Sequence, residues 1–184
     1  GTPEQFVQQN SSNFKKWFGD WQNNTGDVSK VINENKQPLV VYHGSENKFN
    51  NFSIDKFSST GHSEGTYGKG HYFTSNKNTA NNYGNNNELY SVYLNIKNPL
   101  SGDLDEAAGN FGYFKSLKDL KNHFKDVIEE NKISDKELNN LYGNFDSADG
   151  VIIDDINGEK YSEVVAPNSN QIKSATGNNG MFDI

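Results

Sequence analysis

Cysteine is absent from the 184 residues of this chain, and its absence excludes several kinds of site. Disulfide bonds, thiolate nucleophiles and cysteine-ligated zinc centres all require the missing thiol. Long apolar runs are also lacking. None approaches the roughly 20 residues that a membrane-spanning helix needs, and the N-terminus has no basic-then-apolar signal pattern. We therefore expect a soluble protein without a membrane partner, or a domain excised from a longer one.

Positive charge is scarce as well. The chain carries 17 basic residues against 24 acidic ones, which gives a formal net charge of -7. Nucleic-acid-binding domains usually present a basic face, so this balance argues against a binder of the phosphate backbone, although a local basic patch stays open. Hydrophobic residues make up 32% of the chain, below the usual share, so loops and polar surface must be extensive. The length still suits one domain with its own core.

An apolar run that ends in polar residues dominates the first half of the sequence. Pro38 precedes the run Leu39–Tyr42, and His43, Gly44 and Ser45 follow it. A buried strand that delivers polar groups at its C-terminal end is typical of a binding pocket. We therefore predict a central strand that opens at Pro38 and delivers these three residues to a site.

A second stretch of similar form follows a polar loop. Gly68 and Gly70 permit a tight backbone turn, after which Tyr72 and Phe73 favour a strand. The segment Asn78–Tyr83 is predicted to form one or two helical turns that carry a second tyrosine back toward Tyr72. The histidines of this half, His62 and His71, are interpreted as polar loop residues rather than ligands.

The other elements follow from capping and periodicity signals. Thr2-Pro3-Glu4-Gln5 has the pattern of a helix start, and Asn10-Ser11-Ser12 divides the aromatic-rich N-terminal region into two helices. Amphipathic spacing predicts helix within Phe111–Leu141, where Ser134 and Glu137 form a capping box for a further helix. Further expected elements are a short strand or helix at Val28–Asn35, strands at Glu88–Ile96, Val151–Ile153, Tyr161–Ala166 and Gln171–Thr176, and a hairpin turn at Ile156–Glu159.

Four residues on or beside these strands carry most of the chemistry: His43, Tyr72, Tyr83 and Glu163. Their spacing is unlike that of a zinc site, and His43 and Ser45 are too close for a hydrolase triad. Two tyrosine rings can hold a flat heteroaromatic ring, and a glycine lets its backbone reach a ring substituent. A carboxylate can hydrogen-bond a sugar hydroxyl and stabilise an oxocarbenium-like transition state as an N-glycosidic bond breaks.

Six motifs in order along the chain carry a family resemblance. They are Trp17-Phe18-Gly19-Asp20, Val40-Val41-Tyr42-His43-Gly44-Ser45, Gly68-Lys69-Gly70-His71-Tyr72-Phe73-Thr74, Leu94-Asn95-Ile96-Lys97-Asn98-Pro99-Leu100, Asp149-Gly150-Val151-Ile152 and Gln171-Ile172-Lys173-Ser174-Ala175-Thr176. With them the chain resembles the ADP-ribosyltransferase superfamily, in the His-Tyr-Glu branch that contains diphtheria toxin and the poly(ADP-ribose) polymerases. It is most similar to the ADP-ribosyltransferase domains of bacterial and phage polyvalent and polymorphic-toxin proteins.

The resemblance implies an α+β fold in which split antiparallel sheets surround an NAD cleft, with N-terminal and middle helices. His43 would hydrogen-bond ribose hydroxyls of NAD, and Gly44 would hold the nicotinamide amide through its backbone. Tyr72 and Tyr83 would flank the nicotinamide ring, and Glu163 would be the catalytic carboxylate at the ribose 2′-hydroxyl. The implied NAD-binding set is His43, Gly44, Ser45, Tyr72, Phe73, Ala80 and Tyr83, and no metal is implied.

The same resemblance divides the chain. One ADP-ribosyltransferase domain would span residues 1–184, with a helical region at 1–36, a catalytic core at 37–176 and a tail at 177–184. The loop from Phe49 to Tyr67 would lie over NAD, and the loop from Asp154 to Ser162 would meet the target.

The acceptor is less constrained than the donor. The other branch of the superfamily, with Arg-Ser-Glu motifs, contains arginine-modifying toxins that carry Glu or Gln two residues before the catalytic Glu. In this chain that position is Tyr161, and Glu159, four residues before Glu163, would not replace it on the same strand face. We expect mono-ADP-ribosylation of a macromolecule, protein rather than nucleic acid, by a bacterial or phage toxin or effector. It would act in the cytoplasm of the producing or target cell. Delivery within a larger secreted or phage protein, and an immunity protein as partner, stay open. An NAD glycohydrolase and a catalytically silent NAD- or ADP-ribose-binding module remain the alternatives.

Overall fold

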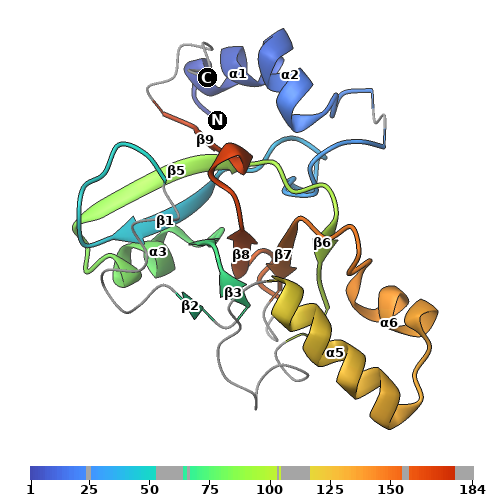
Figure 1. Ribbon diagram of the computed structural model, residues 1–184. Coiled ribbons are helices and arrows are strands. Elements are labelled where there is room, and N and C mark those ends of the chain that lie inside the picture. The colour runs from blue at the N-terminus through green and yellow to red at the C-terminus, as the bar shows by residue number, and fades with distance from the viewer. Residues whose placement is uncertain are drawn as a thin grey trace. The chain divides into compact units, whose positions relative to one another are not determined.

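The computed structural model describes residues 1–23, 26–52, 64–65, 67–102, 104, 117–154 and 158–176. Helices and strands are mixed along this part of the chain, which confirms the α+β class (Figure 1). No helix in these ranges is long and apolar enough to cross a membrane. The helices are α1 (Pro3–Asn10), α2 (Ser12–Phe18), α3 (Lys77–Tyr83), α5 (Leu117–Asn131) and α6 (Asp135–Tyr142), with a 3-10 turn, η2, at Ser169–Gln171.

The strands in the described residues form three sheets. They are β1 (Val41–Ser45), β2 (Glu64–Gly65), β3 (Gly68–Lys69), β4 (His71–Phe73), β5 (Glu88–Leu94), β6 (Pro99–Leu100), β7 (Gly150–Ile153), β8 (Glu163–Ala166) and β9 (Ile172–Ser174). One sheet has the order β1-β5-β9 and another the order β4-β8-β7-β6, while β2 and β3 pair with each other. The chain folds as two compact units, which are described one at a time: Gly1–Phe49, Thr74–Lys97 and Asn170–Ile184 make the first, and Asn50–Phe73 and Asn98–Ser169 the second.

The first unit is built on the antiparallel sheet β1-β5-β9, with β5 in the centre. Thr2 and Gln5 form the predicted capping box of α1, and Ser11 caps α2, so the predicted break between two helices is confirmed. Phe14 of α2 meets Tyr93 of β5 edge to face, with ring centroids 5.1 Å apart. The core around this contact contains Phe14, Phe18, Val28, Tyr93 and Ala175, with Trp17, Trp21, Ile32 and Val40 packed against it.

Two predictions about the first unit are wrong. Val28–Asn35 forms neither a strand nor a helix, although Ile32 makes an isolated bridge with Pro38. Its backbone is instead held by tertiary contacts such as the hydrogen bond from the Lys30 amide to the Ile96 carbonyl, 2.7 Å. Pro38 also does not open the strand that carries His43, because this strand, β1, begins at Val41. In the order β1-β5-β9 it stands at one end of the sheet rather than in its centre.

The second unit contains the mixed sheet β4-β8-β7-β6, covered by α5 and α6. Its strands pair antiparallel except for β6 and β7, which run parallel to each other. The prediction of antiparallel sheets therefore does not hold for this one pair. Strand β6 begins with Pro99, where a missing amide is tolerated at the first residue of a strand. The core contains Tyr67, Leu100, Leu104, Leu120, Phe124, Leu138, Phe145, Val151, Ile153 and Val165.

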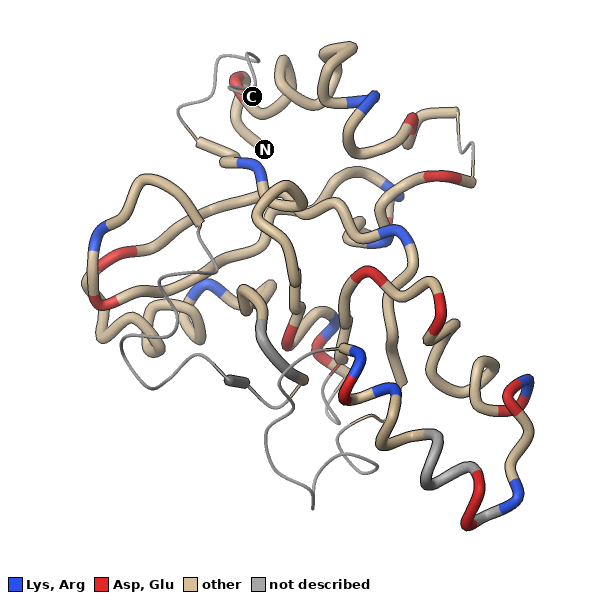
Figure 2. The backbone as a smooth tube through the Cα atoms, in the orientation of Figure 1, with Lys and Arg blue, Asp and Glu red and all other residues tan. Residues whose placement is uncertain are grey.

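The helical and hairpin predictions for the second unit are mostly confirmed. Ser134 and Glu137 form the predicted capping box of α6. Strands β7 and β8 pair as a hairpin whose last ladder pair is Ile153 with Glu163, so β8 begins two residues later than expected. The predicted turn at 156–159 and the helix start at 111–116 fall wholly or partly outside the described residues. Acidic and basic residues are interleaved along the backbone around the turn between α5 and α6 (Figure 2).

Candidate active site

The polar trio His43-Gly44-Ser45 lies on β1, as predicted. Tyr42 exchanges two backbone hydrogen bonds with Thr74, at 2.8 and 3.0 Å. Neighbouring residues of an antiparallel strand direct their amide and carbonyl groups to opposite edges. His43 pairs with Tyr90 of β5, so Gly44 directs its backbone groups to the same edge as Tyr42, away from β5.

Gly44 is also the point at which α3 approaches β1. A Cβ added at Gly44 would lie 1.7 Å from the Ala80 carbonyl oxygen, so only glycine fits. Gly84, just past α3, also lies close to β1, because a Cβ there would be 2.5 Å from the Ser45 amide nitrogen. The close packing leaves Ala80 1% exposed, whereas Tyr83 at the end of the same helix is 80% exposed.

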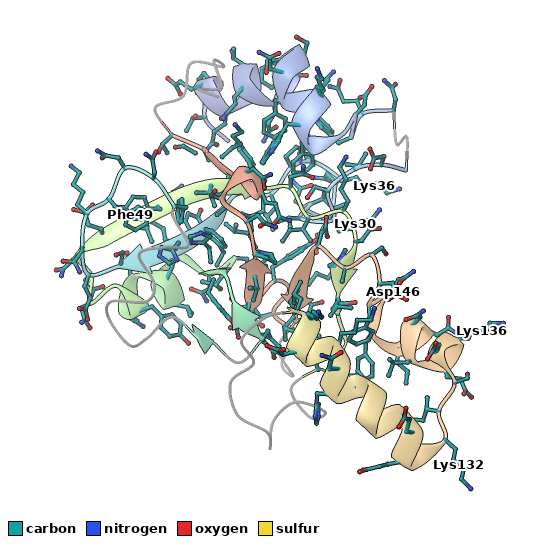
Figure 3. The ribbon with its side chains drawn as sticks, in the orientation of Figure 1. Lys30, Lys36, Phe49, Lys132, Lys136 and Asp146 are labelled. Carbon is teal, nitrogen blue, oxygen red and sulfur yellow. The ribbon has the colours of Figure 1, made fainter. Side chains whose placement is uncertain are left out.

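His43 is bordered by two aromatic rings. Its ring lies 6.3 Å from that of Tyr90, its cross-strand partner, and 6.0 Å from that of Phe49. Phe49 stacks on Tyr90 at a centroid distance of 4.1 Å, and Figure 3 shows it beside β5. Ser45 is engaged locally, because its hydroxyl donates to the Asn47 carbonyl at 2.8 Å.

Tyr72 and Glu163 share one face of the sheet in the second unit. Tyr72 pairs with Val165, which is two residues along β8 from Glu163, and residues two apart on a strand lie on the same face. Phe73 pairs with Val164, so its side chain is on the opposite face, where it is 3% exposed and 5.5 Å from the Phe52 ring. Tyr72 and Glu163 are therefore brought together, and Phe73 is separated from them by the sheet.

The Tyr72 hydroxyl is held neutral. Burial raises the pKa of Tyr72 well above its ordinary value of 10, and the negative charge of Glu163 raises it further. A hydrogen bond from the Tyr67 amide at 3.2 Å acts in the opposite direction and lowers that pKa. Tyr72 consequently remains a phenol that can donate a hydrogen bond near the Glu163 carboxylate at neutral pH.

His71 is not the loop residue that the sequence indicated. It lies in β4, is 1% exposed, and its ring meets Phe52 edge to face at 5.2 Å. His62 lies outside the described residues, as do 53–63 and 66 of the predicted NAD loop and 155–157 of the predicted target loop. Within the described ranges, no three His, Asp or Glu side chains gather as they would around a metal ion.

Several residues around the site escaped prediction. The sequence predicts the strand that contains Tyr90, but it does not predict that Tyr90 lies opposite His43. That pairing follows from the register of β1 on β5. The sequence places Phe49 in a loop and gives no sign of its stacking on Tyr90. The left-handed backbone of Tyr161 had no sequence signal, because only the structure gives its φ of 56°.

His43, Tyr72 and Glu163 each lie on a strand of their own, β1, β4 and β8. A family model described as ADP-ribosyltransferase in polyvalent proteins matches residues 33–182. The chain therefore belongs to the ADP-ribosyltransferases of polyvalent proteins. No protein with a curated function matches the sequence. Membership of this family implies transferase activity with NAD as the co-substrate.

Proposed function

We propose that the chain is a mono-ADP-ribosyltransferase that cleaves NAD at the nicotinamide glycosidic bond and transfers ADP-ribose to a macromolecule, a protein rather than a nucleic acid. The observation that supports it best is the placement of Glu163 beside Tyr72 on one sheet face, close enough for the carboxylate charge to raise the pKa of Tyr72. The family match over residues 33–182 is the second support.

Each proposed residue has a role that its surroundings suit. His43 hydrogen-bonds ribose hydroxyls, and the flanking rings of Tyr90 and Phe49 limit its orientation. Gly44 binds the nicotinamide amide through backbone groups that point away from β5. Ser45 supports the turn after β1 through its bond to Asn47.

The tyrosines and the carboxylate complete the set. Tyr72 and Tyr83 contact the nicotinamide ring, while Ala80 and Phe73 contribute through packing because both are almost fully buried. Glu163 accepts a hydrogen bond from the ribose 2′-hydroxyl and stabilises the positive charge that develops on the ribose as nicotinamide leaves. NAD supplies the ADP-ribosyl group, which a nucleophile of the target then takes up.

We further propose that residues 1–184 act as one catalytic domain within a bacterial or phage effector. The net charge of -7 disfavours a nucleic-acid target and leaves a protein as the acceptor. The position two residues before the catalytic carboxylate does not identify the acceptor residue, because Tyr161 stands where arginine-modifying toxins have an acidic or amide side chain.

The test is nicotinamide release from NAD by the wild type and by Glu163→Gln, each with and without bacterial lysate. Mass spectrometry then searches the lysate for proteins that gain one ADP-ribosyl group. A transferase releases nicotinamide with lysate, labels a protein, and loses both activities in Glu163→Gln. Release without any labelled product would instead make the protein an NAD glycohydrolase. Bound NAD without release would make it a silent binding module.

A further inference from the structure

Tyr161 adopts a left-handed backbone conformation, with a φ of 56°, two residues before Glu163. This conformation is sterically unfavourable for a residue with a bulky side chain. A strained residue persists only where its surroundings hold it, and such residues concentrate at functional sites. In the described part of the second unit, Lys132 is the other non-glycine residue with a positive φ, at 57°. The contacts of Tyr161 therefore indicate what the strain maintains.

Two hydrogen bonds, each between a side chain and the backbone, hold the segment before Glu163. The Tyr161 amide donates to Oδ1 of Asp154, the first residue after β7, at 2.7 Å. The Ser162 hydroxyl donates to the Ile153 carbonyl at 3.0 Å. Both bonds join the end of β7 to the beginning of β8, directly beyond the last ladder pair, Ile153 with Glu163. They extend the hairpin past the point at which its backbone ladder stops.

Glu163 depends on this end of the hairpin more than the rest of β8 does. Val164 and Val165 pair with strands on both sides, with β4 and with β7. The β4 ladder ends at Val164, so Glu163 has its strand partner on β7 alone. A slip of one residue would move Glu163 to the opposite face of the sheet, away from Tyr72. Whatever fixes the register at this point also fixes the carboxylate.

We propose that Asp154 and the left-handed backbone of Tyr161 are positioning residues that hold Glu163 in register on the face it shares with Tyr72. The proposal rests on the proposed function, because the carboxylate that these two residues hold in register is the one proposed to be catalytic. The Asp154 carboxylate fixes the Tyr161 amide, the left-handed residue turns the chain into β8, and Glu163 enters the strand pointing to the Tyr72 face. The backbone of Tyr161 carries this role and its side chain does not.

The first test compares two substitutions of Tyr161 that differ in how well they tolerate a positive φ. Tyr161→Gly accepts a positive φ without strain, whereas Tyr161→Val disfavours it strongly because Val is β-branched. We expect Tyr161→Gly to keep kcat for nicotinamide release near the wild-type value. Tyr161→Val should lower kcat on the order of tenfold or more at an unchanged KM for NAD, since a misplaced catalytic group costs rate rather than binding.

Lys132→Val is the matched control, because it introduces the same strain beyond the end of α5 (Figure 3). It should lower the midpoint of thermal unfolding about as much as Tyr161→Val and leave kcat intact. An equal loss of kcat in Lys132→Val would show that general destabilisation explains the effect. An equal loss of kcat in Tyr161→Gly would assign the role to the tyrosine side chain. Either result overturns the proposal.

The second test removes and restores the acceptor. Asp154→Ala should lower kcat at an unchanged KM, and Asp154→Asn should recover it because an amide oxygen also accepts the Tyr161 hydrogen bond. Amide hydrogen exchange of Tyr161 should speed up in Asp154→Ala and return toward the wild-type rate in Asp154→Asn.

The exchange measurement separates this inference from the proposed function. If the wild type released no nicotinamide under any condition, the proposed function would fail. The exchange rates would still report whether Asp154 holds the Tyr161 amide. If Asp154→Ala left the exchange rate of the Tyr161 amide unchanged, Asp154 would not hold that amide, and this inference would fail whatever the activity of the wild type.

Discussion

Tyr90 and Phe49 are joined by two hydrogen bonds through one hydroxyl group. The Tyr90 hydroxyl accepts from the Phe49 amide at 2.7 Å and donates to the Phe49 carbonyl at 3.0 Å. The two rings also stack, and both lie beside His43. Tyr90 thus anchors the segment that follows β1 to the strand that pairs with β1. The histidine proposed to bind ribose is bordered by this anchored pair.

Removing that hydroxyl should separate anchoring from ring packing. Tyr90→Phe keeps the ring but leaves the partly buried amide and carbonyl of Phe49 without their partner, which costs about 1–3 kcal/mol. We expect a matching loss in urea unfolding and a higher KM for NAD, with a smaller change in kcat. Tyr83→Phe is the stability control, because the Tyr83 side chain is 80% exposed. An unchanged KM in Tyr90→Phe would contradict the role of the anchored pair in binding.

The contact between β1 and α3 predicts a severe effect of a single methyl group. In Gly44→Ala the new Cβ would meet the Ala80 carbonyl oxygen at 1.7 Å, so β1 and α3 must separate. Overpacking costs about 1–3 kcal/mol and sometimes more, and we expect a loss at the upper end because the neighbour is backbone. Gly26→Ala is the control, since a Cβ there meets nothing within 4 Å and pays only for its positive φ, about 1 kcal/mol. If Gly44→Ala and Gly26→Ala lowered the free energy of unfolding in denaturant by the same amount, α3 would be able to move away from β1 at little cost.

Elements with a local cause were predictable from the sequence. The capping boxes of Thr2 with Gln5 and of Ser134 with Glu137 rest on residues three apart, which need no tertiary information. The alternation of residues 88–94 likewise reports a strand with two unequal faces. The apolar run before His43 and the glycines before Tyr72 are likewise local signals, and they identified the strands that carry these two residues.

Features that depend on distant partners were not predictable. Pro99 starts a two-residue strand only because β7 lies parallel to it. Val28 and Val31 are buried, but the backbone near them bonds to residue 96 rather than to a strand or helix of its own. The positive φ of Tyr161 accompanies a hydrogen bond to Asp154, seven residues away, and no local preference of tyrosine reveals it.

The raised pKa of Tyr72 makes stability fall in alkaline solution. The unfolded tyrosine loses its proton near pH 10, while burial and the Glu163 charge keep the folded one protonated to higher pH. The unfolded state therefore binds fewer protons above pH 10, and the free energy of unfolding decreases as the pH rises further. Tyr72→Phe should reduce this slope in unfolding measured between about pH 8 and 11.

Tyr93 provides a comparison for that slope. Burial raises its pKa too, although a hydrogen bond with the Gln9 side chain opposes the shift. Tyr93→Phe should remove its own share of the alkaline slope. If neither substitution changed the slope, the raised pKa of Tyr72 would be refuted.

Glu163→Gln should lower turnover with little effect on NAD binding. The amide keeps the shape of the side chain but not the charge that stabilises positive charge on the ribose. One such transition-state contact is worth roughly 3–4 kcal/mol, or about 10²–10³ in kcat. The check is kcat for nicotinamide release beside the Kd for NAD from calorimetry. A variant with wild-type kcat would remove Glu163 from the mechanism.

Tyr83→Ala should have the opposite kinetic signature. Because Tyr83 is 80% exposed, its ring adds little to the core, and its loss should change the free energy of unfolding by no more than about 0.5 kcal/mol. An exposed ring next to a ligand gains contact only when the ligand is bound, so the expected result is a higher KM for NAD at nearly constant kcat. Ala80, one helical turn earlier, is 1% exposed, so Ala80→Leu should instead destabilise the fold by overpacking. A fall in kcat alone for Tyr83→Ala would count against ring contact and would place Tyr83 in the chemical step.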